Sequence, residues 1–150
     1  MTFKLSERSL TKLEPVKPEL FDVVMEAIEI TKVDFGVICG LRTEDEQKKL
    51  VASGASQTMK SKHLTGDAVD LMAYIGSRGT WELNMYDDVA EAMREAAQNQ
   101  GVRIRWGAAW TVPDIADWNL SMEDAMNSYI DERRAEKRRP FIDAPHFELN

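Results

Sequence analysis

The chain has 150 residues, of which 43% are hydrophobic and 30% charged, and its formal net charge is −7. These values are typical of one soluble globular domain, which we expect to span residues 1–150. The acidic balance argues against non-specific nucleic-acid binding, and no apolar run approaches the ~20 residues of a membrane span. The single cysteine, Cys39, excludes an intrachain disulfide, and its apolar neighbours favour a structural thiol over a nucleophile.

The first third of the chain predicts three helices and one strand. Residues 6–13 form a short helix that begins with a serine cap, and residues 19–31 form a second helix whose apolar positions follow the helical period. Pro18 suits the first turn of that second helix. Residues 34–39 are typical of a buried strand, and residues 43–51 open with a capping box that begins a third helix.

The stretch that follows contains His63, one of only two histidines in the chain. Residues 64–67 are typical of a turn, because Gly66 can adopt positive φ. Residues 68–74 are apolar except for Asp70 and predict a short buried strand. An aspartate in such a strand is costly unless it is paired or binds a metal, and the turn can fold His63 back beside it.

The second half of the chain alternates loops, helices and short strands. We expect a loop over residues 75–85, a helix over 86–99 and a strand over 102–106. A serine cap opens a helix over 121–137, and residues 145–149 are a final strand candidate in which His146 and Glu148 share one face. Together these elements predict an α+β fold, with a small, mostly antiparallel sheet that carries the site and helices packed on its other face.

Each histidine has an aspartate within seven residues of it in the sequence. Asp70 follows His63 by seven residues, and Asp143 precedes His146 by three. Two imidazoles and one carboxylate are a common ligand set for a catalytic zinc ion, and the remaining carboxylate could then act as a general base. From the spacing alone, each histidine could equally be an ordinary surface or core residue.

A family resemblance decides between these readings. The segment from Ser61 to Asp70 matches S-x-H-x-x-G-x-A-x-D, a signature of the zinc peptidases that cleave D-alanyl-D-alanine or L-alanyl-D-glutamate (the VanY-like family). Asp143-Ala144-Pro145-His146 is similar to the second motif of this family. The similarity extends over almost the whole chain and is greatest to the L-alanyl-D-glutamate endopeptidase branch, which includes many bacteriophage endolysins.

The resemblance implies one zinc ion bound by His63, Asp70 and His146, with Asp143 as the catalytic base. The expected reaction is hydrolysis of the L-Ala–D-Glu bond of the peptidoglycan stem peptide by a zinc-activated water. The alternatives are a D-alanyl-D-alanine carboxypeptidase of the same family, or a non-catalytic module that binds peptidoglycan or a protein.

Other residues are candidates for binding substrate or shaping the cleft. Gly40 to Gln47 matches G-x-R-S/T-x-x-x-Q and is similar to the arginine segment of the family, so Arg42 is expected to hold a substrate carboxylate rather than form a structural ion pair. Ser61 either binds substrate or stabilises its own loop. Trp106 and Trp110 lie in a segment that resembles W-G-G-x-W, and Glu148 either orients a zinc ligand or faces solvent.

The remaining expectations concern context. Residues 113–140 resemble an insertion before the second motif, which we interpret as a surface helix rather than a lid over the cleft. The N-terminus has no hydrophobic signal segment. By its resemblance to endolysins, the protein is expected to be made in the host cytoplasm and to act on the cell wall after the membrane is opened. We expect a monomer with no nucleic-acid or membrane partner.

Overall fold

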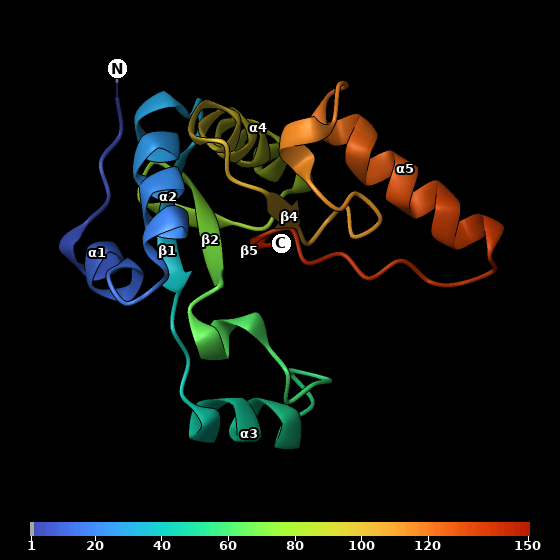
Figure 1. Cartoon of the computed structure of the whole chain (residues 1–150), viewed down its shortest axis with the longest axis horizontal. Helices are drawn as coiled ribbons and strands as arrows, with labels where there is room; N and C mark the ends of the chain where they lie inside the picture. The colour runs from blue at the N-terminus through green and yellow to red at the C-terminus, as the bar shows by residue number, and fades with distance from the viewer. Residues whose placement is uncertain (1) are drawn as a thin grey trace.

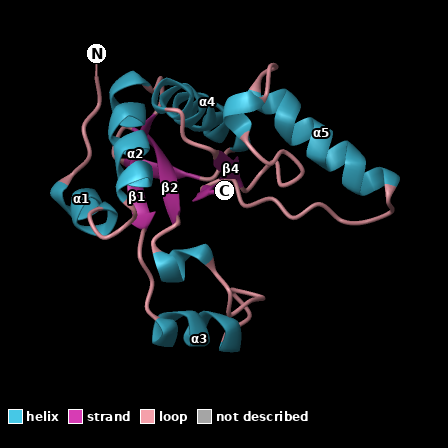
Figure 2. Cartoon of the chain, viewed as in Figure 1, coloured by secondary structure: helices cyan, strands magenta, loops and turns pink. Residues whose placement is uncertain are grey.

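The computed structural model describes residues 2–150, and one antiparallel sheet lies at its centre (Figures 1 and 2). The neighbouring strands follow the order β1-β2-β5-β4, and the short β3 pairs with β2. The strands are β1 (Asp34–Cys39), β2 (Ala68–Ile75), β3 (Arg78–Thr80), β4 (Ile104–Trp106) and β5 (His146–Leu149). Every pairing is antiparallel, which confirms the α+β fold and the predicted sheet type.

Two helices, α2 (Pro18–Ile30) and α4 (Leu83–Gln100), pack together and against the sheet to form the core (Figure 1). Their buried positions recur at helical spacing, as in the series Leu20, Val23, Val24, Ala27 and Ile28 of α2. The apolar residues of β1, β2 and β5 complete the same core. No helix among residues 2–150 combines the length and apolar character needed to cross a membrane.

The other helices flank this core. The short α1 (Glu7–Leu13) begins at the predicted cap Ser6 and packs on β1. Below the sheet in Figure 1, α3 (Glu44–Ala52) opens with the predicted capping box and buries only Gln47. At the right of Figure 1, α5 (Met122–Ala135) buries one of its faces. The chain then returns as a long segment to β5, which lies between β2 and β4 in the sheet.

One prediction is wrong in part. Residues 75–85, expected to be a loop, contain β3 and the first turn of α4, which begins at Leu83 rather than Tyr86. A tight turn at Gly76-Ser77, with Gly76 at φ 62°, folds β3 back on β2 as a hairpin. A glycine-led two-residue turn is a hairpin signal in its own right, but the three residues of β3 have no apolar alternation to support it.

One helix position adds a pH dependence to the stability of this fold. Asp87 lies on α4, and its Oδ1 is buried without a hydrogen-bond partner among the described residues. Burial, with smaller contributions from Glu123, Asp88 and Glu91, raises the pKa of Asp87 to about 6. Because the folded-state pKa is raised, the cost of ionising Asp87 is absent at acidic pH and is fully present above pH 6.

We therefore expect Asp87→Asn to stabilise the protein at pH 7.5 but not at pH 4. The gain should be about 1 kcal/mol at most, since water screens this half-buried carboxylate. Thermal unfolding across this pH range tests the prediction, with Asp131→Asn, an exposed position on α5, as the control for the change in net charge. An equal gain in both variants at every pH would contradict it.

Candidate active site

Pairing of β2 with β5 brings together two of the predicted ligands. Asp70 and His146 are directly opposed in the register, and Asp70 Oδ1 lies 3.1 Å from His146 Nδ1. Because side chains alternate along a strand, His146 and Glu148 share the site face, whereas Phe147 points into the core and stacks on Trp106. The predicted strand alternation therefore places the second motif beside the first.

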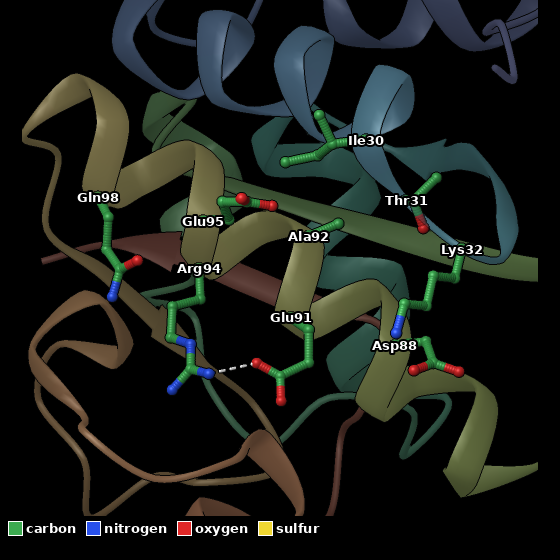
Figure 3. A pocket seen from close by; sticks show the side chains of 9 residues that line it. All are labelled: Ile30, Thr31, Lys32, Asp88, Glu91, Ala92, Arg94, Glu95 and Gln98. Carbon is green, nitrogen blue, oxygen red and sulfur yellow. Dashed lines mark hydrogen bonds and ion pairs between the residues drawn. The ribbon is translucent and has the colours of Figure 1, made fainter.

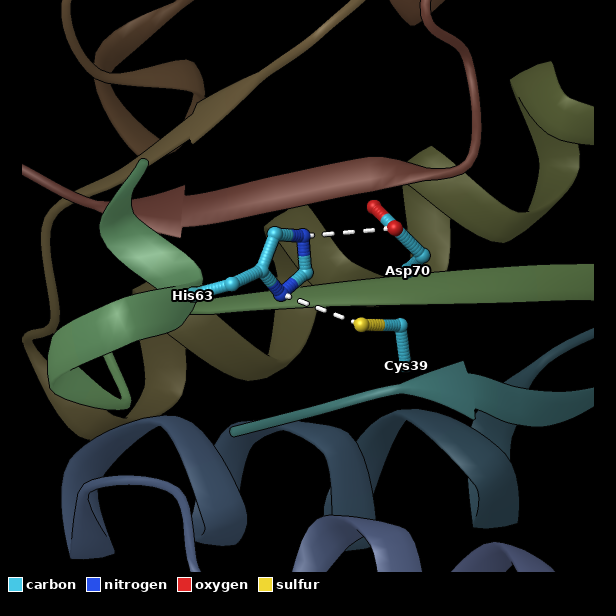
Figure 4. A group of neighbouring side chains, drawn as sticks. All are labelled: Cys39, His63 and Asp70. Carbon is cyan, nitrogen blue, oxygen red and sulfur yellow. Dashed lines mark hydrogen bonds and ion pairs between the residues drawn. The ribbon is translucent and has the colours of Figure 1, made fainter. Parts of the chain in front are cut away.

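His63 reaches the same carboxylate from the 3-10 helix η1 (Lys62–Thr65), as Figure 4 shows. The hydroxyl of Ser61 caps this turn by accepting a hydrogen bond from the His63 backbone N–H, and Gly66 ends the turn at φ 74°. The ring is buried, with Nε2 3.2 Å from Asp70 Oδ2 and Nδ1 2.8 Å from the carbonyl oxygen of Gly40. Since a carbonyl can only accept, Nδ1 carries a proton, and Nε2 is directed at Asp70.

His146 is oriented in a similar way by Glu148. The Nε2 atom of His146 lies 2.8 Å from Glu148 Oε1, and Lys62 Nζ lies 3.3 Å from the other carboxylate oxygen. Glu148 is buried and contacts the imidazole instead of facing solvent. Each histidine thus has one nitrogen fixed by a partner and the other nitrogen directed at Asp70.

The charges in this cluster favour a cation. Burial disfavours the ionised carboxyl of Asp70, but hydrogen bonds from His146 and His63 outweigh it and hold the pKa of Asp70 well below its ordinary value. Burial likewise opposes charge on the imidazoles, yet contacts with the carboxylates raise the pKa of His63 and of His146. The negative charge that stabilises a proton on these nitrogens also attracts a metal ion, which must displace that proton to bind.

Asp143 lies beside this cluster at the end of the segment that leads into β5. Ligand atoms of Asp70, Asp143 and His146 all lie within 4.8 Å of one another. Gly107 holds the segment in place, since its N–H donates to the His146 carbonyl and its own carbonyl accepts from the Asp143 N–H, both at 2.8 Å. A Cβ at Gly107 would meet the Asp143 carbonyl oxygen at 2.2 Å, so a larger residue would displace Asp143.

Comparison with known proteins places this chain in a family. The model of the family described as phage L-alanyl-D-glutamate peptidase matches residues 1–150. The chain belongs to this family. It is 35% identical over 153 residues to the L-alanyl-D-glutamate peptidase of Escherichia phage T5, with 99% of each chain covered.

Two further similar proteins have names that describe the same activity. An L-alanyl-D-glutamate peptidase of Listeria phage A118 is 34% identical over 71 residues, which are 47% of this chain and 24% of that protein. The crystal structure of the Serratia marcescens L-Ala D-Glu endopeptidase ChiX has a TM-score of 0.73 and 32% sequence identity, covering 98% of this chain and 90% of that one.

Arg42 lies on the His63 side of the site. Its Nη1 donates to the Gln47 side-chain oxygen at 2.7 Å, its Nη2 to Cys39 Sγ at 3.2 Å, and Nη2 lies 3.9 Å from Asp70 Oδ2. Gln47 is fully buried, and its amide also donates to the Ser56 hydroxyl and to the Thr58 carbonyl. Gln47, which belongs to the same motif, therefore holds Arg42 in place. The sequence did not predict this role.

Cys39 also lies within reach of the cluster, and Cys39, His63 and Asp70 form a second group that could hold a metal ion. The sulfur lies 3.6 Å from Nδ1 of His63, the nitrogen that donates to Gly40, whereas Asp70 faces Nε2 (Figure 4). Cys39 and Asp70 thus lie at different nitrogens of one ring. We therefore assign Cys39 to the support of His63 and Arg42.

The two tryptophans have different surroundings. Trp106 is fully buried and donates from Nε1 to the Ala144 carbonyl at 2.7 Å, so it belongs to the core. Trp110 is half-buried, and its ring centroid lies 5.6 Å from that of His146. Ala108 and Ala109, which lie between the two tryptophans in the sequence, are both fully buried.

A separate groove lies between the end of α2 and the outer side of α4 (Figure 3). It measures about 450 Å³, and its charged side chains include Lys32, Asp88, Glu91, Arg94 and Glu95. None of its lining residues belongs to the histidine cluster. The groove is therefore not part of the candidate active site.

Proposed function

We propose that this family member is a zinc-dependent endolysin that hydrolyses the L-Ala–D-Glu bond of the peptidoglycan stem peptide. The observation that carries the proposal is the convergence of His63 and His146 on the two oxygens of Asp70, with Asp143 alongside. The names of the phage relatives and of the family give the bond.

The donor types fit zinc, and in this structure they lie in two groups that share Asp70, one with Cys39 and His63 and one with Asp143 and His146. Two imidazole nitrogens and one carboxylate leave a fourth position open, as in catalytic zinc sites, and the carbonyl of Gly40 and the carboxylate of Glu148 orient the two rings. His63, Asp70 and His146 would hold the ion. When bound, zinc would polarise the scissile carbonyl and lower the pKa of a water molecule towards about 7.

We assign the proton transfers of the reaction to Asp143. Its carboxylate accepts a proton from the attacking water and delivers it to the leaving amine of D-glutamate. The hydrogen bonds of the Asp143 and His146 backbones to Gly107 fix the distance of this carboxylate from Asp70 and His146. The base is thus positioned by backbone contacts.

Arg42 and Ser61 are assigned to substrate binding. A guanidinium has five N–H donors, and Gln47 and Cys39 engage only part of them, so Arg42 retains donors for the free α-carboxylate of D-glutamate. The Ser61 oxygen accepts from the His63 backbone, which leaves its own O–H free to donate to a substrate carbonyl.

The setting of the reaction is also a proposal. We propose that residues 1–150 work as one catalytic domain and as a monomer. The phage origin of the relatives supports synthesis in the host cytoplasm and action on the wall once the membrane is opened.

The metal assignment predicts that the purified protein carries about one zinc ion per chain. His63→Ala, Asp70→Ala and His146→Ala should each remove it. Asp143→Ala should retain zinc but lower kcat by about 10²- to 10⁴-fold, because only the base is lost. Elemental analysis and hydrolysis of soluble muropeptides measure the two effects.

Asp67→Ala is the matched control for these variants. Asp67 lies in the same motif as Asp70, but its carboxylate pairs with Lys17 at 3.1 Å, so zinc content should be unchanged. Equal zinc loss in Asp143→Ala and Asp70→Ala would mean that the two carboxylates are assigned wrongly. Activity that survives complete removal of metal would refute the zinc mechanism.

The bond assignment predicts the products from a muropeptide with a full stem. Mass spectrometry should find L-alanine still attached to the muramyl group and a released peptide that begins with D-glutamate. Arg42→Ala should lower kcat/KM by about 10- to 100-fold without loss of zinc, and Arg42→Lys should not restore it, since the two-pronged contact is lost. Release of D-alanine alone would instead assign the protein to the carboxypeptidase branch.

A further inference from the structure

Two aromatic side chains continue the site outwards from His146. Trp110 lies against the imidazole, and the ring of Phe141 stacks on Trp110 at 6.3 Å between centroids and 20° between planes. Phe141 is 56% exposed, although it is a large apolar residue only two positions before Asp143. We call Trp110 and Phe141 the aromatic wall.

The chain holds this wall in place through contacts other than burial of the rings. Tyr129 on α5 is fully buried, and its hydroxyl both accepts from the Phe141 N–H at 2.8 Å and donates to the Phe141 carbonyl at 3.1 Å. Arg105 lies over the Trp110 ring at 5.2 Å and donates from Nε to the Trp110 carbonyl. A fixed but exposed aromatic surface is typical of a binding site, because a ligand that covers it removes apolar area from water without having to order it.

The wall and Arg42 lie at opposite ends of the site. Asp70 Oδ2 faces His63 and Arg42, whereas Asp70 Oδ1 faces His146, against which Trp110 packs. A substrate that crosses the cluster with a carboxylate at Arg42 therefore directs its other end towards the wall. Under the proposed function, that other end is the L-alanine side of the scissile bond.

On that side of the scissile bond the substrate carries a sugar. The amino group of L-alanine is acylated by the lactyl group of muramic acid, so the saccharide ring follows the scissile carbonyl within about two residue lengths, roughly 7 Å. A saccharide ring presents C–H bonds on its faces, and the electron-rich face of an aromatic ring attracts them. Such a ring needs a flat, accessible aromatic partner, which the exposed ring of Phe141 provides.

We infer that the aromatic wall is a subsite for the N-acetylmuramyl sugar, and that Phe141 determines preference for a stem peptide still attached to its glycan. The inference rests on the proposed function, because that function sets the direction in which the substrate crosses the site. It also gives α5 a role, since Tyr129 positions Phe141.

The test compares kcat/KM for two substrates that share one stem peptide. In the first, L-alanine carries N-acetylmuramic acid; in the second, it carries a simple acetyl group. The unmodified protein should prefer the muramyl substrate by about five- to tenfold. Phe141→Ala should reduce this ratio to near one, Phe141→Trp should retain it, and Tyr129→Phe should lower it.

Trp81→Ala is the matched control. Trp81 is 63% exposed and stacks on Tyr86 in a pair of the same kind, but it lies two residues before α4 rather than at the histidine cluster. Its removal should leave the ratio unchanged. Zinc content and thermal unfolding, measured for every variant, identify any that fail to fold.

Three outcomes would overturn the inference. Equal rates on both substrates for the unmodified protein would leave the proposed function standing and remove the sugar subsite. An equal loss on both substrates in Phe141→Ala would show that the wall contacts the peptide instead. If neither substrate is cut between L-alanine and D-glutamate, the proposed function and this inference fail together.

Discussion

The carboxylate of Asp70, shared by two buried imidazole rings, is the contact on which the rest of this site depends. A carboxylate withdrawn from water costs several kcal/mol unless charged or hydrogen-bonding partners surround it. Here β5 supplies one imidazole by strand pairing and η1 supplies the other by a tight turn. Pairing of the central strands β2 and β5 therefore also supplies one of the two imidazole partners that the Asp70 carboxylate needs.

The groups around this cluster are positioned mainly by backbone and buried polar contacts. Gly107 allows β4 and the segment before β5 to approach closely enough to place Asp143. Gln47, the one buried residue of α3, holds Arg42. Tyr129 holds the backbone of Phe141 from α5. Gly107 thus determines where the base lies, whereas contacts from α3 and α5 determine where Arg42 and the aromatic wall lie.

Much of this arrangement could be predicted from local patterns. The apolar run of β2, the alternation in β5 and a turn that requires positive φ at Gly66 indicated how His63, Asp70 and His146 could meet, and the family resemblance selected this reading. What could not be predicted depends on contacts between distant segments. Neither the hold of Tyr129 on Phe141, twelve residues apart, nor the choice of nitrogen with which each histidine faces Asp70 is encoded in spacing. The strand β3 was missed because its three residues lack an apolar period.

X-ray absorption at the zinc K-edge tests the central claim most directly, because it identifies the atoms that bind the ion. The account predicts a first shell of nitrogen and oxygen only, at about 2.0–2.2 Å, with two imidazole ligands. The spectrum of Cys39→Ser should match that of the unmodified protein, since Cys39 lies at the other nitrogen of His63. A sulfur scatterer at about 2.3 Å, lost in Cys39→Ser, would place the ion in the Cys39-His63-Asp70 group and contradict the assignment of His146 as the third ligand.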